Sequence, residues 1–311
     1  MCLVVPDEEE EEESTSIIPL TDRMGQKLEK TGNPHYMEVD GLFLPISFSR
    51  ENFIYATKHR PEDGDIILAG YPNSGLKTIA IMLHLLTRKK ADTISSEIPL
   101  LEWCGKDVEK LARPRIIRTH LPYYRLSINP LAKYIYTVRN PKDCCAYSFD
   151  DAVTYPEDYG YLEGRFDEFL DIFLKGKVHG NDYFKHVMSW WPRRNDSHVL
   201  LLVLEDLRME SRFYLERILG FLGRDDMVAN AKNIGLLQEV LENIGTGPAH
   251  SRIMDIKMCT QDGPIARVST AGYWKNYFTC GQSKRMDSVF VERTKGLEMR
   301  HLWNDYDVFA I

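Results

Sequence analysis

The chain has 311 residues, of which 43% are hydrophobic and 11% aromatic. This length suits one large α/β domain or two small ones, and the composition can supply a substantial core. The formal net charge is -7, and Asp7 with the following six glutamates supplies seven of the negative charges. The rest of the chain is balanced, with 39 basic and 39 acidic residues. It therefore has no overall field that would attract nucleic acid or a membrane surface, and an anion site must be local.

The first 16 residues are expected to form a disordered acidic tail, because a run of like charges repels itself and buries no apolar surface. A docking segment for a basic partner is the alternative. Residues 17–311 are expected to form one domain.

No apolar run approaches the roughly 18 residues of a membrane-spanning helix, and residues 1–6 are too short for a signal peptide. The six cysteines form no C-x-x-C pair, which indicates neither a metal site nor a disulfide framework. We therefore expect a cytoplasmic protein.

The predicted elements alternate in type along the chain. A short strand pair is expected at 36–46, followed by a helix at 49–58 that Ser49 caps and that buries Phe53, Ile54 and Ala56. Apolar runs without alternation predict strands buried on both faces at 66–69, 115–120, 133–139 and 199–205. Helices are predicted at 76–89, 142–151, 165–174, 182–191, 207–222 and 227–244. Strands that alternate with helices predict an α/β fold with a parallel sheet flanked by helices on both faces.

The most informative segment lies between the first buried strand and the next helix, at residues 70–78 (GYPNSGLKT). Glycines let the backbone approach a ligand closely, and the start of a helix favours an anion. Ser74 and Thr78 can add hydroxyl donors, and Lys77 adds a positive charge. The spacing between the second glycine and the lysine is one residue longer than in a Walker A loop, which argues against an ordinary NTPase. An ordinary strand-to-helix turn without a ligand is the alternative.

Several motifs in this sequence resemble, in the same order, those of the cytosolic sulfotransferases. Residues 71–75 resemble the YPKSGTTW loop, residues 118–122 resemble KTHLP, and residues 136–143 resemble YVARNPKD. Further similarity to YEDM, ILEFLG and RKGxxGDWKNxFT occurs at 204–207, 218–223 and 267–279. The resemblance extends from about residue 41 to residue 293. The sequence is thereby identified as a divergent member of the family, with a P-loop-like phosphate-binding loop in a single domain.

The resemblance implies transfer of a sulfuryl group from 3′-phosphoadenosine 5′-phosphosulfate (PAPS) to a hydroxyl or amine of a small, largely apolar acceptor. It requires no metal. It implies that His120 is the general base and that Asn73 and Lys77 assist the leaving group. The implied donor-binding residues are Ser74, Gly75, Leu76, Lys77, Thr78, Arg139, Tyr147 and Arg267. The implied acceptor pocket contains Pro45, Phe48, Arg118 and Phe149. Taken without the resemblance, His120 could equally be a packed core histidine and each arginine a surface ion pair.

The sequence also departs from the family pattern. Asn73 stands where the family has a catalytic lysine, and loss of one such stabilising group typically costs on the order of 10²–10³ in rate. Thr78 replaces a tryptophan that would stack on adenine, Leu204 replaces an adenine-side tyrosine, and Tyr147 replaces a serine that helps to hold the 3′-phosphate. These departures leave a second hypothesis open, in which the protein binds a nucleotide or a small apolar ligand with weakened catalysis or none.

A phosphotransferase that uses Mg²⁺ is a third hypothesis, for which residues 205–206 could supply the acid, but the loop spacing fits it poorly. The segment that resembles the family's dimerisation motif carries Lys284 in place of its final acid, so a monomer and a dimer both stay open.

Overall fold

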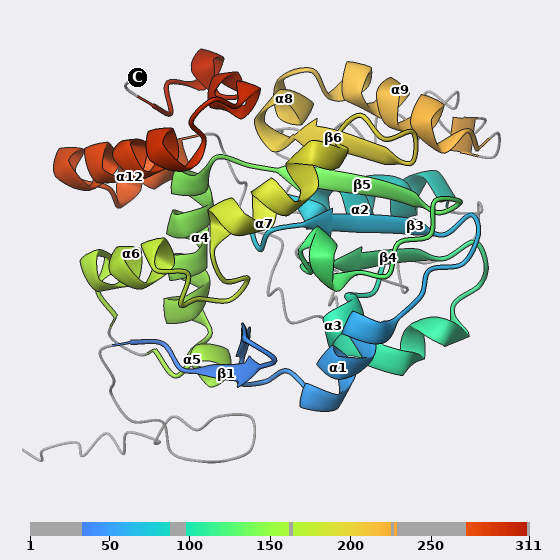
Figure 1. Ribbon diagram of the computed structural model, residues 1–311, viewed down its shortest axis with the longest axis horizontal. Coiled ribbons are helices and arrows are strands. Elements are labelled where there is room, and N and C mark those ends of the chain that lie inside the picture. The colour runs from blue at the N-terminus through green and yellow to red at the C-terminus, as the bar shows by residue number, and fades with distance from the viewer. Residues whose placement is uncertain (1–32, 88–97, 162–163, 225–226, 229–271, 310–311) are drawn as a thin grey trace, which may run out of the picture.

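The computed structural model describes residues 33–87, 98–161, 164–224, 227–228 and 272–309 (Figure 1). The predicted acidic tail at 1–16, Arg267 and most of the predicted helix at 227–244 lie outside these ranges. Within them, no helix has both the length and the apolar character that crossing a bilayer requires.

Four parallel strands form the central sheet in the order β4-β3-β5-β6. Their bounds are Ile66–Gly70 for β3, Ile116–Thr119 for β4, Lys133–Val138 for β5 and Val199–Val203 for β6. Every residue of β3 is buried, as expected for a central strand of a sheet that is covered on both faces. The prediction of a parallel sheet with these four strands is confirmed.

Alternate residues of the strands belong to two apolar clusters, one on each face of the sheet. Ile67 and Tyr136 belong to the larger cluster, which also takes in residues of α4, α6, α7 and α12. These helices span Pro141–Thr154, Phe166–Leu174, Tyr183–Trp190 and Cys280–Arg293. Leu68 and Ile135 belong to the second cluster, together with residues of α2 (Leu76–Thr87) and α9 (Ser211–Leu222). Figure 1 shows α7 in front of the sheet and α2 behind it, so the predicted helices on both faces are confirmed.

The segment before the sheet forms the predicted hairpin and helix. Strands β1 (Tyr36–Val39) and β2 (Leu42–Pro45) pair antiparallel. The Ser49 side chain caps α1 (Arg50–Lys58) by accepting a hydrogen bond from the backbone N–H of Asn52. The expectation that Ile54 is buried is wrong, since 38% of it is exposed. The buried residues of α1 are Phe53 and Ala56, and a helix turns by about 100° per residue, so Ile54 points away from them.

Short helices complete the described part of the chain. The predicted helix at 207–222 is two helices, α8 (Leu204–Met209) and α9, because the backbone of Glu210 leaves the helical region with φ of -124° and ψ of 45°. Two one-turn helices were not predicted, α3 (Leu101–Cys104) and α5 (Pro156–Tyr159).

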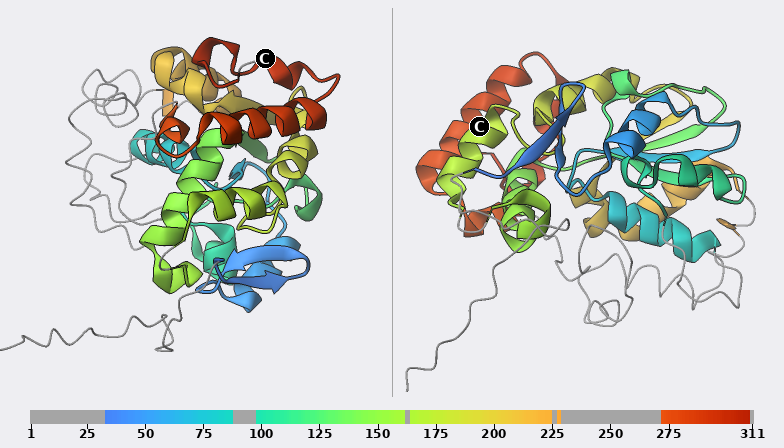
Figure 2. Two further views of the ribbon diagram at one scale, coloured as in Figure 1. Left: turned by 90° about the vertical axis from the view of Figure 1, so that its left-hand side faces the viewer. Right: turned by 90° about the horizontal axis from the view of Figure 1, so that it is seen from below.

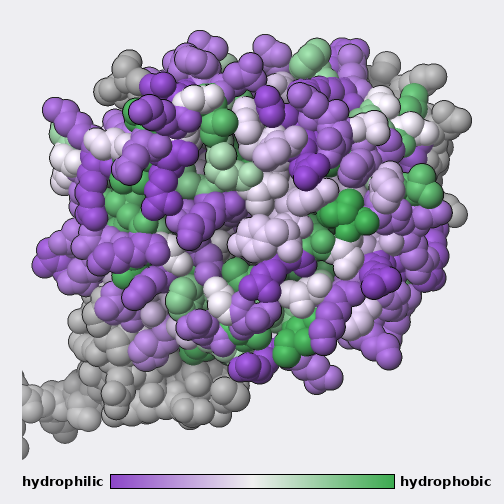
Figure 3. All heavy atoms as spheres, viewed as in Figure 1, coloured by the Kyte–Doolittle hydropathy of each residue, from purple (hydrophilic) through white to green (hydrophobic). Residues whose placement is uncertain are grey.

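A buried lysine connects α12 to the rest of the domain. Lys142 on α4 donates from Nζ to Ser283 Oγ at 2.8 Å, and its Nζ lies 2.6 Å from Asp287 Oδ1, both on α12. Figure 2 shows α12 running beside α4 and α6. The face of the molecule in Figure 3 is covered mostly by hydrophilic side chains, with hydrophobic ones in separate small patches.

The parallel strands place their carboxyl ends at one edge of the sheet, where open α/β sheets bind ligands. Gly70 ends β3, His120 follows β4, Arg139 follows β5, and Leu204 follows β6. The candidate site is built at this edge.

Candidate active site

The loop at residues 71–75 has a backbone shape that its own residues enforce. Asn73 and Gly75 have φ angles of 65° and 97°, in the left-handed region that asparagine and glycine adopt at least cost. A Cβ atom on Gly75 would lie 2.4 Å from Cδ1 of Leu204, so the loop approaches the residue that follows β6 too closely for any side chain. The buried Ser74 hydroxyl hydrogen-bonds Thr137 Oγ1 on β5 at 3.1 Å. The loop is therefore held against β5 and against the first residue of α8.

Helix α2 begins directly after this loop, at Leu76. The first N–H groups of a helix have no acceptor within the helix, and together with the helix dipole they favour an anion. Lys77 and Thr78 lie half-buried in this first turn. The first described turn of α2 contains no acidic residue that would repel such an anion. The loop and the helix start therefore fit the phosphate end of a nucleotide.

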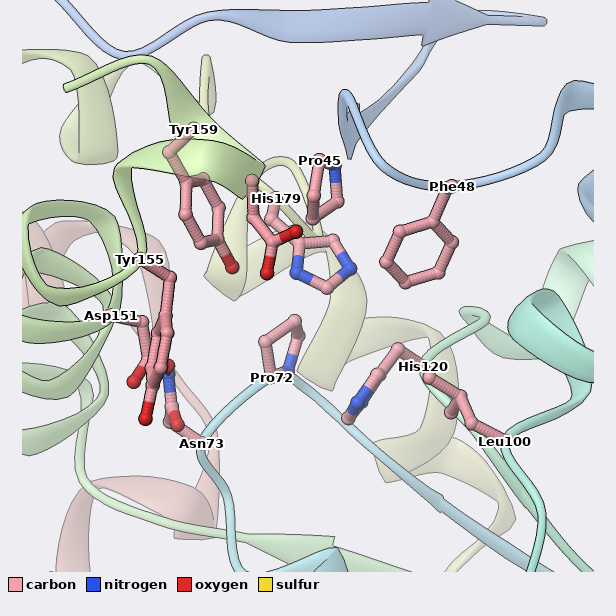
Figure 4. A pocket seen from close by; sticks show the side chains of 11 residues that line it. Pro45, Phe48, Pro72, Asn73, Leu100, His120, Asp151, Tyr155, Tyr159 and His179 are labelled. Atoms are coloured by element: carbon pink, nitrogen blue, oxygen red, sulfur yellow. Dashed lines mark hydrogen bonds between the residues drawn. The ribbon is translucent and has the colours of Figure 1, made fainter. Parts of the chain in front are cut away.

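His120 lies beside this loop in one defined orientation. Its Nδ1 atom is 2.9 Å from the backbone oxygen of Gly70. A carbonyl oxygen can only accept a hydrogen bond, so Nδ1 carries the proton, and in the neutral ring Nε2 keeps its lone pair. Figure 4 shows the ring at the wall of a cavity together with Pro72 and Asn73. An imidazole held in this tautomer can take a proton from a group that enters the cavity.

The backbone of His120 is held on both sides by buried side chains. Glu102 Oε1 accepts its N–H at 2.6 Å and also accepts the Thr119 hydroxyl at 2.6 Å. The His120 carbonyl oxygen accepts from Nε2 of His186 at 3.0 Å, and Nδ1 of His186 is 3.1 Å from the Tyr136 hydroxyl. Burial lowers the pKa of His186 to about 3, so this ring stays neutral and donates from Nε2. These hydrogen bonds hold the backbone of His120, the candidate base, in a fixed position.

Asn73 points toward helix α4. Its Nδ2 donates to Asp151 Oδ2 at 2.9 Å and to Ser148 Oγ at 3.3 Å. The position where the resemblance places a catalytic lysine therefore holds a neutral amide bonded to a carboxyl group. An amide can donate a hydrogen bond to a leaving oxygen but brings no positive charge.

Arg139 lies against the same loop from the end of β5. It is 2% exposed, and Nη1 donates to the backbone oxygen of Asn73 at 3.2 Å. Nη2 lies 3.4 Å from Asp143 Oδ2, and the guanidinium carbon lies 4.3 Å from the centre of the Tyr147 ring. Burial raises the pKa of Tyr147 to about 12, so the arginine faces a neutral ring. The guanidinium group therefore places a positive charge in direct contact with the backbone of the loop.

A cavity of about 60 Å³ opens beside His120 (Figure 4). Its walls combine apolar side chains and acidic ones with a second histidine, and include Pro45, Phe48, Leu100, Asp151, Asp158 and His179. Figure 4 shows Asn73 and Asp151 on one side of the cavity, with Phe48 and His120 on the other. A small acceptor in this cavity would lie between the imidazole and the loop.

Comparison with known proteins assigns the family. Residues 63–298 match the family model described as the sulfotransferase domain. This chain belongs to the sulfotransferase family. Over 260 residues it is 31% identical to an amine sulfotransferase of Oryctolagus cuniculus, covering 78% of this chain and 84% of the relative. Over 284 residues it is 28% identical to sulfotransferase 1E1 of Homo sapiens, covering 84% and 93%.

Solved structures of other proteins agree with the fold. Mouse sulfotransferase SULT7A1, crystallised in complex with PAP, superposes with a TM-score of 0.72 at 26% identity and covers 86% of this chain and 97% of that one. A retinol dehydratase in complex with androsterone and PAP superposes with a TM-score of 0.63 at 19% identity, covering 85% and 91%, which supports the fold alone. The predicted fold and family are thereby confirmed.

The sulfotransferase brings together most of the predicted site residues that the structure describes. His120, Asn73, Ser74, Gly75 and Arg139 meet through the contacts above, and Tyr147 lies across the arginine. The side chain of Leu76 is buried, with 3% exposed, in the apolar cluster behind the sheet. Arg267 lies outside the described residues.

The predicted acceptor pocket is only partly assembled in this sulfotransferase. Pro45 and Phe48 line the cavity beside His120, whereas Arg118 and Phe149 do not. Arg118 is buried, and its Nε donates to the backbone oxygen of Ile98 at 2.8 Å. Phe149 packs edge-on against other rings on the far side of α4, among them Phe166 and Phe169.

Sequence reasoning missed several polar residues that line the cavity or contact His120. Asp151 follows Tyr147 by four positions on α4, one helical turn, so the spacing could have placed it on the same face. Glu102 and His179 gave no such signal, because a one-turn helix and a loop carry no periodic pattern.

Replacing His186 with asparagine is expected to reduce the acid sensitivity of the fold. In the folded protein His186 stays neutral, whereas in the unfolded chain the same side chain binds a proton below its ordinary pKa of 6.5. The unfolded state therefore binds more protons in the window between about 6.5 and 3, and stability is lost as the pH falls through it, by up to about 1.4 kcal/mol per unit. Urea unfolding of the wild type from about pH 6.5 to pH 5 should show a steeper loss than in His186→Asn. Equal slopes for the two proteins would show that His186 is protonated in the fold.

Proposed function

We propose that the protein transfers the sulfuryl group of PAPS to a hydroxyl or amine of a small acceptor, with His120 as the base. The supporting observation is the hydrogen bond from His120 Nδ1 to the Gly70 carbonyl, which leaves Nε2 as the ring nitrogen that carries a lone pair, on a ring that lines one cavity with Pro72 and Asn73. The acceptor oxygen or nitrogen would form its bond to sulfur while the bond between sulfur and the 5′-phosphate oxygen breaks. The acceptor proton would pass to Nε2 of His120.

The described residues also support a place for the donor. The N–H groups around Gly75 and Leu76 would receive the 5′-phosphate, assisted by Ser74, Lys77 and Thr78. Arg139 would approach the 3′-phosphate, where a guanidinium can form two parallel hydrogen bonds. Together with the PAP-bound relative, this arrangement supports PAPS as the donor. We further propose that the protein acts in the cytoplasm on small molecules, without a nucleic acid or membrane partner, as a monomer or a dimer.

Leaving-group stabilisation is the weakest part of this proposed site. Asn73 supplies a neutral donor that Asp151 already engages. Lys77, in the first turn of α2, supplies a positive charge on the phosphate side of the loop. We therefore expect slower chemistry than a lysine at position 73 would give. A binding protein without turnover shares the same donor site and differs only in this step.

The proposed function predicts that PAP stabilises the protein and that His120 is needed for turnover. At about 100 times its Kd, PAP should stabilise the fold by about 2.7 kcal/mol, measured as a rise in melting temperature. Radiolabelled sulfate should pass from PAPS to phenol, and His120→Asn should reduce the rate by at least about 100-fold while the rise with PAP persists.

Each other outcome has a distinct meaning. A rise in melting temperature without transfer supports the binding protein. Stabilisation by ATP with Mg²⁺, and not by PAP, supports the phosphotransferase. Transfer that is unchanged in His120→Asn contradicts the assignment of the base.

Restoring a lysine at position 73 is predicted to speed turnover most when Asp151 is neutralised as well. The ammonium group of Asn73→Lys would meet the Asp151 carboxyl group, which now lies 2.9 Å from the amide, and would be drawn away from the leaving oxygen. The double variant Asn73→Lys/Asp151→Asn should raise kcat by about 100-fold, and the single Asn73→Lys by less. Asp151→Asn alone is the control and should give no gain. If kcat is the same in the double variant and the wild type, stabilisation of the leaving oxygen does not depend on residue 73.

A further inference from the structure

A second, smaller cavity adjoins the first. His120 and His179 line both of them. The second has a volume of about 20 Å³, which is room for about one non-hydrogen group such as a hydroxyl, an amine or a water molecule. Its walls are mainly apolar and include Leu42, Leu44, Phe53 and Leu121. The proposed transfer reaction leaves this space without a role.

Glu102 on α3 lines this second cavity and is only 2% exposed. Its Oε1 atom accepts from both the Thr119 hydroxyl and the His120 N–H. Its Oε2 atom is buried and has no hydrogen-bond partner within the described ranges. A buried acceptor without a donor is unfavourable, so a ligand that supplies one gains affinity.

Asn181 also lines this cavity, but its side-chain amide already makes hydrogen bonds. Asn181 accepts the Phe43 N–H at 2.8 Å and donates to the Gly41 carbonyl at 2.8 Å. The amide therefore has its bonds on the β1–β2 hairpin. Of the carboxyl and amide side chains that line this cavity, Glu102 is therefore the one with an oxygen, Oε2, that lacks a hydrogen-bond partner within the described residues.

We propose that Glu102 determines acceptor specificity, by receiving on Oε2 a hydrogen bond from a second donor group of the acceptor. This inference rests on the proposed function, since it deals with the same acceptor site. His120 lines both cavities, and the second cavity has room for about one non-hydrogen group. The second donor group of the acceptor must therefore lie close to the hydroxyl or amine that reacts. The preferred acceptors are compact molecules with two adjacent donors, such as a catechol or a 1,2-amino alcohol.

The test compares catechol with phenol, which lacks the second donor. In the wild type, kcat/KM for catechol should exceed that for phenol by about 10- to 100-fold, the discrimination expected of a hydrogen bond to a charged group. Glu102→Gln keeps an oxygen for His120 and Thr119 but places an N–H₂ donor where Oε2 stands. This variant should reduce the preference to about threefold or less. The exposed Glu51→Gln on α1, with the same chemical change outside both cavities, should keep the wild-type preference.

A binding measurement separates this inference from the proposed function. With saturating PAP, catechol should raise the melting temperature of the wild type more than phenol does, and this difference should vanish in Glu102→Gln. If neither compound is sulfated and the difference still appears, the proposed function fails and the role of Glu102 stands. If both are sulfated with a preference that Glu102→Gln does not change, Glu102 only supports His120 and water fills the cavity. If Glu102→Gln does not fold, a wild-type preference of threefold or less overturns the inference by itself.

Discussion

The hydrogen bond between His120 Nδ1 and the Gly70 carbonyl is the contact on which the site depends. It joins the ends of the two neighbouring strands β3 and β4, whose parallel register pairs Ala69 with Thr119. Because of that register, the residues that come next in the chain, Gly70 and His120, lie at the same edge of the sheet. The bond then selects the imidazole tautomer that leaves Nε2 able to accept a proton.

Gly70 has little freedom to change. A Cβ atom there would lie 2.4 Å from Ser74 Oγ and 2.6 Å from Thr137 Oγ1. A side chain at this position would force Ser74 or Thr137 to shift and would disturb their contact between the loop and β5. The loop at 71–75 and His120, the proposed base, are therefore linked through Gly70, and Glu102 and His186 add hydrogen bonds to the His120 backbone.

The charges around this unit set the limits of its chemistry. Arg139 is buried against Asp143 and the ring of Tyr147, and Asn73 is bonded to Asp151. Compared with the family pattern, the leaving-group side has lost a positive charge while a carboxyl group lies one hydrogen bond away. In the proposed mechanism, the contacts that would orient His120 for proton removal are present, and the stabilisation of the leaving oxygen is reduced. This combination makes acceptor positioning, including the contact proposed for Glu102, more important to the rate.

Much of this could be predicted from the sequence, because the strands are short apolar runs and the motifs lie at their ends. The sheet, the loop and the place of His120 follow from those local signals. The break at Glu210 did not, because no glycine or proline marks it in the sequence. The exposure of Ile54 did not either, because an apolar side chain next to the buried Phe53 can lie on either side of the helix. Arg118 and Phe149 lie near the correct elements, but their side chains turn into other parts of the core. The pairing of Asn73 with Asp151 needs the three-dimensional approach of α4 to the loop.

The most direct test of the account is the protonation state of the His120 ring in solution. ¹⁵N chemical shifts of histidine-labelled protein, assigned by comparison with His120→Gln, report which ring nitrogen carries the proton. The account predicts that at about pH 8 Nδ1 is protonated and Nε2 is not. A proton on Nε2, or rapid exchange between the two forms, would show that the Gly70 carbonyl does not hold the ring and would contradict the role of His120 as the base.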